Sequence, residues 1–326
     1  MKGQQDIDEM YMRRCLQLAA CGREGAAPNP MVGAVVVCDG RIIGEGFHKR
    51  CGEAHAEVNA IASVKDPELL QRSTLFVSLE PCAHYGKTPP CAQLIIDKRI
   101  PSVVVGCRDP FAKVDGRGIA MLREAGIEVR EGILEKECLW LNRRFITFHT
   151  HHRPYITLKW AQSQDGYIDH TRQDDKTPPA QFSTPLTRML VHQLRAEHQA
   201  ILVGRRTWEL DHPSLTVRHW TGKNPISIVL SHNGFTIEGE TFTPSTDEML
   251  SALMEALHQR GIQSLLVEGG TTTLQSFMDA GLWDEMRVET APKELGTGVK
   301  APTPPCEKVK SEEIDGNCID FFVKKL

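Results

Sequence analysis

The chain has 326 residues, of which 40% are hydrophobic and 25% charged, and its formal net charge is −4 at pH 7. The length exceeds what one hydrophobic core comfortably holds and predicts about two domains. The slightly acidic balance favours neither nucleic acid nor an anionic membrane as partner, and the sequence shows no signal-type or membrane-spanning apolar run. We therefore expect a cytoplasmic protein that acts on a small molecule. In that reducing setting most of its ten cysteines are expected to be buried thiols, and any that cluster with histidine are candidate metal ligands.

Strand and helix patterns alternate through the first half of the chain. Residues 31–48 predict a β-hairpin, because two β-branched runs flank Asp39-Gly40, a strong two-residue turn signal. The elements expected after it are a helix in 55–64, a strand in 73–80, a helix in 91–100, a strand in 102–110, and a helix with a short strand in 116–133. This order predicts a sheet layered by helices, with some parallel neighbours.

The stretch His-Thr-His-His at 149–152 separates two regions with different motifs. No cysteine or carboxylate with matching spacing lies near it in the sequence, so we expect a solvated linker and not a metal site. The predicted domains are therefore residues 1–150 and 151–326. In the second, strands are expected in 154–166, 200–208, 225–231, 263–270 and 285–296, with helices in 186–198, 247–261 and 271–284.

His55 and Glu57 open the helix predicted in 55–64, and Cys82 and Cys91 each follow a proline beyond the next strand. A Cys₂His set holds zinc and leaves a fourth position open for water. Zinc deaminases combine His-x-Glu with Pro-Cys-x-x-Cys and use the glutamate as a proton carrier. We interpret His55, Cys82 and Cys91 as zinc ligands and Glu57 as the catalytic proton carrier. A closed structural zinc, or a capping histidine with two ordinary buried thiols, remain the alternatives.

Four segments, 27–37, 44–61, 78–95 and 106–129, resemble in order the deaminase domain of the bifunctional RibD family of riboflavin biosynthesis. The resemblance implies a cytidine-deaminase-like three-layer domain. It also implies a substrate, a diaminopyrimidinone carrying ribose 5-phosphate, whose C2 amino group is replaced by zinc-activated water while Glu57 carries the proton. The substrate-binding positions implied are Asn29, His48, His84, Lys87 and Asp109.

The second half lacks a Gly-x-Gly-x-x-Gly motif after any predicted strand, so a standard Rossmann site is unsupported. Instead, "VGRRTW" at 203–208 and "EGGTTT" at 268–273 place glycines and free backbone N–H groups between a strand and a helix. Such corners, with paired arginines nearby, suit a pyrophosphate and a 2′-phosphate. With "APKELG" at 291–296, they resemble the family's reductase domain, which has a dihydrofolate-reductase-like α/β fold.

The resemblance implies that NADPH transfers a hydride to C1′ of the ring-opened ribose. The NADPH-binding positions expected are Ala161, Phe182, Arg205, Thr207, Asp211, Gly270, Thr271, Thr272, Thr273, Leu274, Gln275 and Ser276. The reductase substrate positions expected are Lys159, Asp165, Arg195, Leu215, Arg218 and Glu268. The chain departs from the family at 180–183, where Ala-Gln-Phe-Ser stands in place of the usual Ser-x-Trp-Ile, and at His232, where a serine is usual.

Together these features predict an enzyme with Zn²⁺ and NADPH as cofactors and a phosphoribosyl pyrimidine as substrate. We expect a homo-oligomer with no nucleic-acid or membrane partner. The departures at 180–183 leave open an active deaminase with a silent reductase half. A zinc deaminase that acts on another base is a further alternative.

Overall fold

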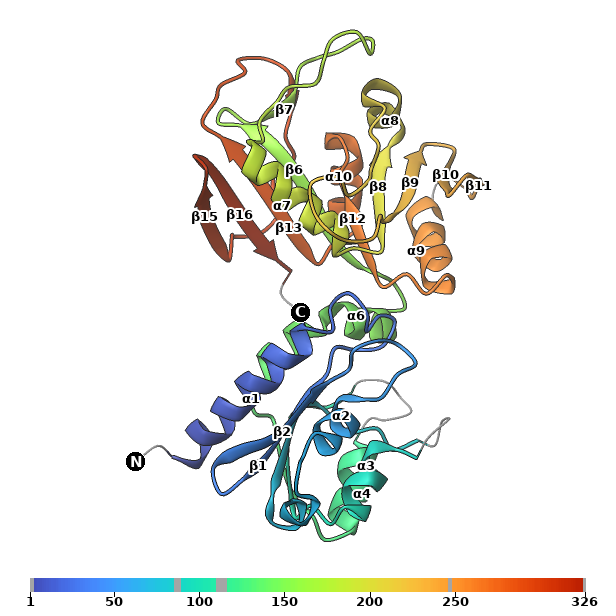
Figure 1. The fold of residues 1–326 in the computed structure, drawn as a ribbon. Coiled ribbons are helices and arrows are strands. Elements are labelled where there is room, and N and C mark those ends of the chain that lie inside the picture. The colour runs from blue at the N-terminus through green and yellow to red at the C-terminus, as the bar shows by residue number, and fades with distance from the viewer. Residues whose placement is uncertain (1–2, 85–88, 110–115, 246–247, 325–326) are drawn as a thin grey trace. The chain divides into compact units, whose positions relative to one another are not determined.

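The structure is a computed structural model that describes residues 3–84, 89–109, 116–245 and 248–324. The chain divides into two compact units between His151 and His152, inside the stretch expected to separate the domains (Figure 1). Each unit has its own sheet and its own hydrophobic core. Among the described residues, no helix combines the length and the apolar character needed to cross a bilayer.

The first unit contains a five-stranded sheet in the order β2-β1-β3-β4-β5. Its strands are β1 (Gly33–Cys38), β2 (Arg41–Phe47), β3 (Thr74–Leu79), β4 (Ser102–Cys107) and β5 (Glu128–Glu131). β3, β4 and β5 run parallel, whereas β1 pairs antiparallel with β2 and β3. Asp39 and Gly40, at φ 50° and 71°, form the β1–β2 turn, because a two-residue turn of this kind needs positive φ at both positions. The predicted hairpin is confirmed.

Helices cover both faces of this sheet and give three layers. α1 (Gln4–Ala20) and α5 (Glu135–Leu141) pack on one face, and α2 (Ala56–Ala62), α3 (Cys91–Asp97) and α4 (Arg117–Glu124) pack on the other. The 3₁₀ helix η1 (Pro67–Arg72) precedes β3. Val36 faces the α2 side and Val35 the α1 side, and every residue of β1 is buried. A strand covered on both faces reads as a continuous apolar run, which explains why the first half shows so little alternation.

The His-Thr-His-His stretch is not a linker. Residues His149 to His151 form the last turn of α6 (Arg143–His151), whose buried side includes Phe145 and Phe148. The apolar residues upstream extend the helix through the polar stretch, and only His152, at φ 52°, leaves it. The expectation of a solvated linker was therefore wrong for three of its four residues.

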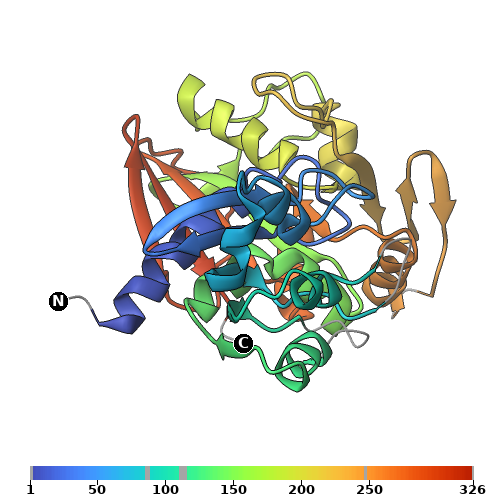
Figure 2. The same ribbon diagram turned by 60° about the horizontal axis from the view of Figure 1, so that its bottom comes forward.

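The second unit contains a nine-stranded sheet in the order β11-β10-β9-β8-β12-β6-β13-β16-β15. Its strands are β6 (Tyr155–Ser163), β8 (Ala200–Gly204), β9 (Ile226–Ser231), β10 (Gly234–Ile237), β11 (Glu240–Phe242), β12 (Ser264–Val267), β13 (Glu285–Ala291), β15 (Lys310–Ile314) and β16 (Asn317–Val323). Strands β9, β8, β12, β6 and β13 are parallel, and antiparallel hairpins continue the sheet at both edges, one of them β10–β11 (Figure 2). A separate pair joins β7 (Tyr167–Asp169) to β14 (Val299–Lys300).

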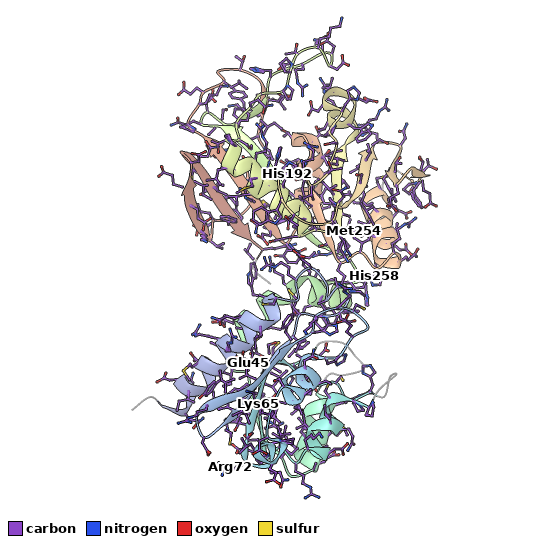
Figure 3. The ribbon with its side chains drawn as sticks, viewed as in Figure 1. Glu45, Lys65, Arg72, His192, Met254 and His258 are labelled. Carbon is purple, nitrogen blue, oxygen red and sulfur yellow. The ribbon has the colours of Figure 1, made fainter. Side chains whose placement is uncertain are left out.

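The two faces of this larger sheet differ in chemistry. The face under α9 (Met249–Gln259) and α10 (Thr271–Asp279) carries the main apolar core, which includes Leu158, Met254 and Phe277. The opposite face lies under α7 (Pro185–Ala196), which presents the buried His192 (Figure 3). α8 (Arg205–Asp211) begins directly after β8. Ionisable side chains gather on the α7 face, where Arg195 of α7 reaches Glu268.

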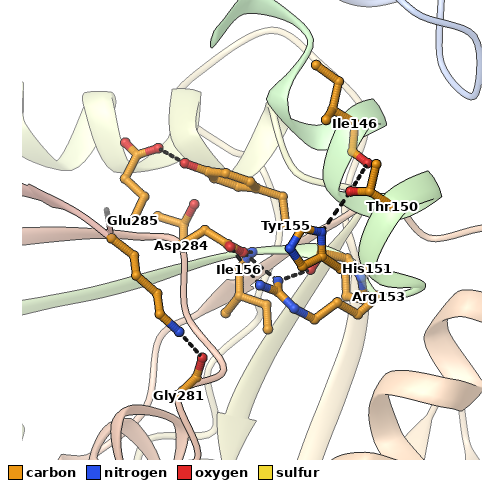
Figure 4. A network of polar contacts seen from close by, with 12 residues as sticks. Ile146, Thr150, His151, Arg153, Tyr155, Ile156, Gly281, Asp284 and Glu285 are labelled. Carbon is orange, nitrogen blue, oxygen red and sulfur yellow. Dashed lines mark hydrogen bonds and ion pairs between the residues drawn. The ribbon is translucent and has the colours of Figure 1, made fainter. Parts of the chain in front are cut away.

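A partly buried ion pair ties the start of β6 to the start of β13 (Figure 4). The Arg153 guanidinium donates to both oxygens of Asp284 at 2.6 and 2.7 Å, and the two side chains are 13% and 12% exposed. Asp284 Oδ2 also accepts the backbone N–H of Ile156 at 2.7 Å. Two neighbouring parallel strands thus share one carboxylate.

Replacing Asp284 by alanine should destabilise the second unit. The exchange leaves both the Arg153 guanidinium and the Ile156 N–H without their acceptor, at a cost of about 3 kcal/mol in the free energy of unfolding. Differential scanning calorimetry should show the second unit melting earlier, with the first unit unchanged. Glu285→Gln is the matched control, because its oxygen can still accept from the Tyr155 hydroxyl. An equal effect of D284A and E285Q would contradict the assignment.

Candidate metal centre and ligand cavity

Three predicted metal ligands meet in the first unit. His55 Nδ1 lies 3.6 Å from Cys82 Sγ and 3.3 Å from Cys91 Sγ, and the three atoms all lie within 4.8 Å of one another. His55 caps α2, Cys91 is the first residue of α3, and Cys82 follows β3. The Cys91 N–H at the start of α3 also donates to Cys82 Sγ at 3.3 Å. Within the described ranges, no other group of three such side chains is close enough to hold a metal ion.

The protonation of this cluster fits a divalent cation. Hydrogen bonding with Cys91 lowers the pKa of Cys82 to about 4, while the same pairing, with burial, raises the pKa of Cys91 far above its ordinary value. In this pair the proton therefore stays on Cys91, and Cys82 is the sulfur that ionises readily. Zinc binds Cys₂His sets of this kind by displacing such protons, and three protein ligands leave a fourth position for water.

Glu57 stands beside the cluster and is 3% exposed. Burial, reinforced by the charge of Cys82, raises the pKa of Glu57 to about 7. It lies in the first turn of α2, two residues after His55. A carboxylic acid that titrates near neutrality can both accept and deliver a proton, which a closed structural metal site does not require.

Asn29 and His48 lie against the same centre. His48 Nδ1 faces the Ala54 carbonyl at 3.2 Å, and because a carbonyl only accepts, Nδ1 carries the proton. Burial lowers the pKa of His48, so the ring is neutral and its Nε2 accepts from Asn29 Nδ2 at 3.1 Å. The His48 and His55 rings are 5.5 Å apart. The Asn29 amide is therefore oriented with its nitrogen toward His48.

The other predicted substrate positions of this unit are Asp109, His84 and Lys87. Asp109 is 8% exposed and follows β4. His84 is exposed and follows Cys82 by two residues. Lys87 lies outside the described residues. Of the five predicted substrate positions, the structure brings Asn29 and His48 to the metal cluster.

Glu80, which the sequence reasoning did not single out, connects the end of β3 to Asp109 and to the start of α4. Its carboxylate is 4% exposed and accepts four backbone N–H groups, those of Asp109, Gly116, Gly118 and Ile119, at 2.9 to 3.3 Å. A Cβ at Gly118 would lie 1.9 Å from the Pro81 carbonyl oxygen, so only glycine fits there. The available signal was a glutamate directly after a mostly apolar, almost fully buried strand.

The second unit holds a cavity of about 1430 Å³ on the α7 side of its sheet. Single-ligand pockets commonly measure about 300 to 1,000 Å³, so this one has room for a cofactor and a substrate together. The predicted residues that line it are Lys159, Ala161, Phe182, Arg195, Arg205, Thr207, Asp211, Leu215, Arg218, Glu268, Gly270, Thr271, Thr272, Thr273 and Ser276.

Three predicted ligand positions do not line the cavity. Leu274 is 0% exposed and packs in the core under α10, and Gln275 donates to Asp279 on the same helix. Asp165 accepts the backbone N–H groups of Leu295 and Gly296 at 3.0 and 2.7 Å. A side-chain contact of these residues with a ligand is therefore unsupported. Leu274 faces the core because of its position on α10, and the side chains of Gln275 and Asp165 are bonded within the protein.

Two glycine corners form the wall of the cavity. Gly204 caps α8 after β8, and Gly270 caps α10 one residue after Gly269. A Cβ at Gly204 would lie 2.3 Å from Thr273 Oγ1, and one at Gly269 would lie 2.8 Å from Thr273 Cβ. The two corners therefore close on Thr273, and their free N–H groups suit the phosphates of a dinucleotide.

Charged groups gather at the cavity's inner end. Arg195 donates to both oxygens of Glu268 at 3.0 and 2.7 Å. Burial opposes the ionisation of Glu268, but Arg195 and Lys159 hold its pKa below the ordinary value. Burial lowers the pKa of Lys159, against the opposing charges of Glu268 and Glu289. His192, neutral because burial and Arg195 lower its pKa to about 4, accepts the backbone N–H of Arg218 at 2.9 Å.

Two known domain families match the chain. The cytidine and deoxycytidylate deaminase zinc-binding region matches residues 5–107, which include the metal cluster. The RibD C-terminal domain matches residues 154–315, which include the cavity.

Whole-length relatives share both units. Riboflavin biosynthesis protein RibD of Aquifex aeolicus is 39% identical, with 90% of this chain and 89% of that protein covered. The Escherichia coli protein of the same name is 36% identical, with 90% of each chain covered. The crystal structure of a diaminohydroxyphosphoribosylaminopyrimidine deaminase/5-amino-6-(5-phosphoribosylamino)uracil reductase from Thermotoga maritima has a TM-score of 0.85 at 36% identity, with coverage of 98% and 99%. Identity at this level over both units shows that the chain belongs to the RibD family of riboflavin biosynthesis proteins.

Proposed function

We propose that the chain is a bifunctional enzyme of riboflavin biosynthesis. Its first unit deaminates 2,5-diamino-6-(5-phosphoribosylamino)pyrimidin-4(3H)-one. Its second unit reduces the ribose of 5-amino-6-(5-phosphoribosylamino)uracil to the ribityl chain. The observation that carries the proposal is the joint presence of a Cys₂His cluster with a buried carboxylic acid and a two-ligand cavity lined by arginines.

In the deaminase, His55, Cys82 and Cys91 hold the zinc ion. Zinc, when bound, supplies an activated water for attack on C2 of the pyrimidine. Glu57 would accept a proton from the attacking water and deliver protons to the ring nitrogen and the departing amine, so that one water would be consumed and ammonia would leave. Its pKa near 7 supports both directions of transfer.

In the deaminase, residues near the metal cluster bind the substrate. Asn29 uses its nitrogen toward His48, so its oxygen is the atom left to meet the pyrimidine. His84 and Asp109 are assigned to the ribose phosphate end, together with Lys87. The positive donors in this set suit an anionic phosphate.

In the reductase, NADPH supplies the hydride for C1′. Arg205, Thr207 and the Gly270 corner hold the cofactor's phosphates, and the remaining cofactor positions are Ala161, Phe182, Asp211, Thr271, Thr272, Thr273 and Ser276. Arg195, Leu215 and Arg218 hold the substrate, with Glu268 locked to Arg195. Lys159 delivers the proton to the ribose oxygen that is freed as the ring opens.

A deaminase with a silent reductase is the competing function. Ala180, where the family commonly has serine, offers no hydroxyl to a ligand and lines the cavity. The intact charge cluster of Lys159, Arg195 and Glu268 favours an active reductase instead. A deaminase for another base is disfavoured by the second unit, which has no role in that reaction.

We infer in addition that the enzyme works in the cytoplasm as a homo-oligomer. All ten cysteines are free thiols, which supports a reducing compartment. Sedimentation velocity on the zinc-loaded protein tests the oligomer. A single species with the mass of one chain would contradict it.

The exchange Glu57→Gln should abolish ammonia release without loss of zinc. The amide keeps the shape of the side chain but carries no exchangeable acid proton, so the rate should fall at least about a hundredfold. Ammonia is measured enzymatically and zinc by mass spectrometry. Glu53→Gln, an exposed position on the same segment, is the control and should keep full activity. Ammonia release by E57Q within tenfold of the unaltered rate would refute the role.

The exchange Lys159→Met should stop NADPH oxidation and spare the deaminase. Methionine keeps the apolar stem and removes the proton donor, so kcat of the reductase should fall at least about a hundredfold. Ammonia release in the same sample reports on folding. Lys293→Met, in an exposed position, is the control. If K159M oxidised NADPH at a near-normal rate, another proton donor would have to be sought.

A further inference from the structure

Glu289 is a buried carboxylate that the roles above leave unused. It lies in β13, is 0% exposed, and pairs in the sheet register with Ala161 of β6. Ala161 lines the cavity, and so does Lys159, two residues earlier on the same face of β6. Glu289 therefore lies in the sheet beside the strand that forms the cavity floor.

Three side chains donate to this carboxylate. Oε2 accepts from the Ser183 hydroxyl at 2.9 Å, and Oε1 accepts from the Thr187 hydroxyl at 2.6 Å and from Asn317 Nδ2 at 2.7 Å. Asn317 also donates to the Phe182 carbonyl at 2.9 Å. One carboxylate thus binds the segment before α7 to β13 and, through Asn317, to β16.

The carboxylate is held in its charged form. Burial opposes the ionisation of Glu289, but the hydrogen bond from Thr187, the charge of Lys159 and the bonds from Asn317 and Ser183 hold its pKa below the ordinary value. The Arg287 guanidinium stands 3.9 Å from Oε2, outside hydrogen-bond range. Because a buried carboxylate loses its water, it depends on these three donors and holds them firmly.

These hydrogen bonds determine whether the Ser183 hydroxyl can donate to a ligand. The single proton of the Ser183 hydroxyl is directed to Glu289, so it is not offered to a ligand. Phe182 is 7% exposed and, with Ser183, lines the cavity. Held this way, Phe182 forms a fixed apolar part of the wall, and the Ser183 hydroxyl beside it is not a donor to a ligand.

We propose that Glu289 is a positioning residue of the reductase, which fixes Phe182 in the wall of the NADPH subsite by holding Ser183, Thr187 and Asn317. The inference rests on the proposed function, since it takes the cavity as the NADPH site. It also explains how a chain without the family's usual serine and tryptophan keeps an ordered cofactor wall.

Three variants of the full-length, zinc-loaded protein test the proposal. Glu289→Gln keeps the shape but removes the charge and turns one acceptor into a donor, so the Kd of NADPH should rise about tenfold. The KM for NADPH should rise with it, while kcat stays within about threefold. Ser183→Ala should have a smaller effect of the same kind. The double variant should bind NADPH no more weakly than E289Q, because Ser183 acts through Glu289.

The controls separate positioning from general stability. Asp284→Ala loosens the same unit at the start of β13 and should leave the Kd of NADPH unchanged where the unit is folded. Glu285→Gln, on the same face of the same strand, should also leave it unchanged. Binding is followed by NADPH fluorescence, and ammonia release in the same samples shows that the first unit is intact.

An unchanged Kd in E289Q, within twofold, would overturn the proposal. So would equal weakening by S183A in both backgrounds, because Ser183 would then contact the ligand itself. If E289Q unfolds the second unit, S183A becomes the deciding variant, because it removes only one of the three hydrogen bonds. Weaker NADPH binding by S183A then supports the proposal, and unchanged NADPH binding overturns it. If the unaltered protein binds no NADPH, the reductase assignment fails and this inference fails with it.

Discussion

Carboxylates that folding removes from water must receive either a proton or donors, and this constraint shapes both sites. Burial raises the pKa of Glu57 to about 7, so that this side chain can hold and release a proton near neutral pH beside the metal cluster. Glu80 receives four backbone N–H groups and thereby holds Asp109 and the start of α4 against the end of β3. In the second unit, Glu268 receives the Arg195 guanidinium and Glu289 receives two hydroxyls and an amide. Of these four glutamates, Glu57 is suited to proton transfer, and the other three hold neighbouring groups in position.

Sheet topology brings these groups together. The metal thiols follow β3 and begin α3, and Asp109 follows the neighbouring parallel strand β4, so all lie at one edge of the first sheet. In the second unit, β8 and β12 also run parallel and end in the two glycine corners of the cavity. Parallel α/β sheets place ligands at the carboxyl ends of their strands, and both units follow that rule.

The sequence predicted what depends on neighbours along the chain. The Asp39-Gly40 turn follows from local conformation. The cluster of His55, Cys82 and Cys91 follows from a His-x-Glu motif and two Pro-Cys pairs, although eight residues separate the cysteines where the deaminase motif has two. The long-range side-chain pairs were not predictable in this way. Asn317 reaches Glu289 from β16, a strand that the sequence analysis did not identify. Thr187 meets Glu289 from 102 residues away. The end of α6 was also misjudged, because apolar residues upstream outweighed the polar His149, Thr150 and His151.

If both units are active in one chain, one substrate is first deaminated and then reduced. An assay of this sequence gives the zinc-loaded protein the diaminopyrimidinone ribotide and NADPH, and follows ammonia release and NADPH oxidation in the same sample. The expected result is that both occur in equimolar amounts, with NADPH oxidation lagging behind ammonia. Ammonia release without NADPH oxidation would contradict it and would leave a deaminase joined to a silent second unit.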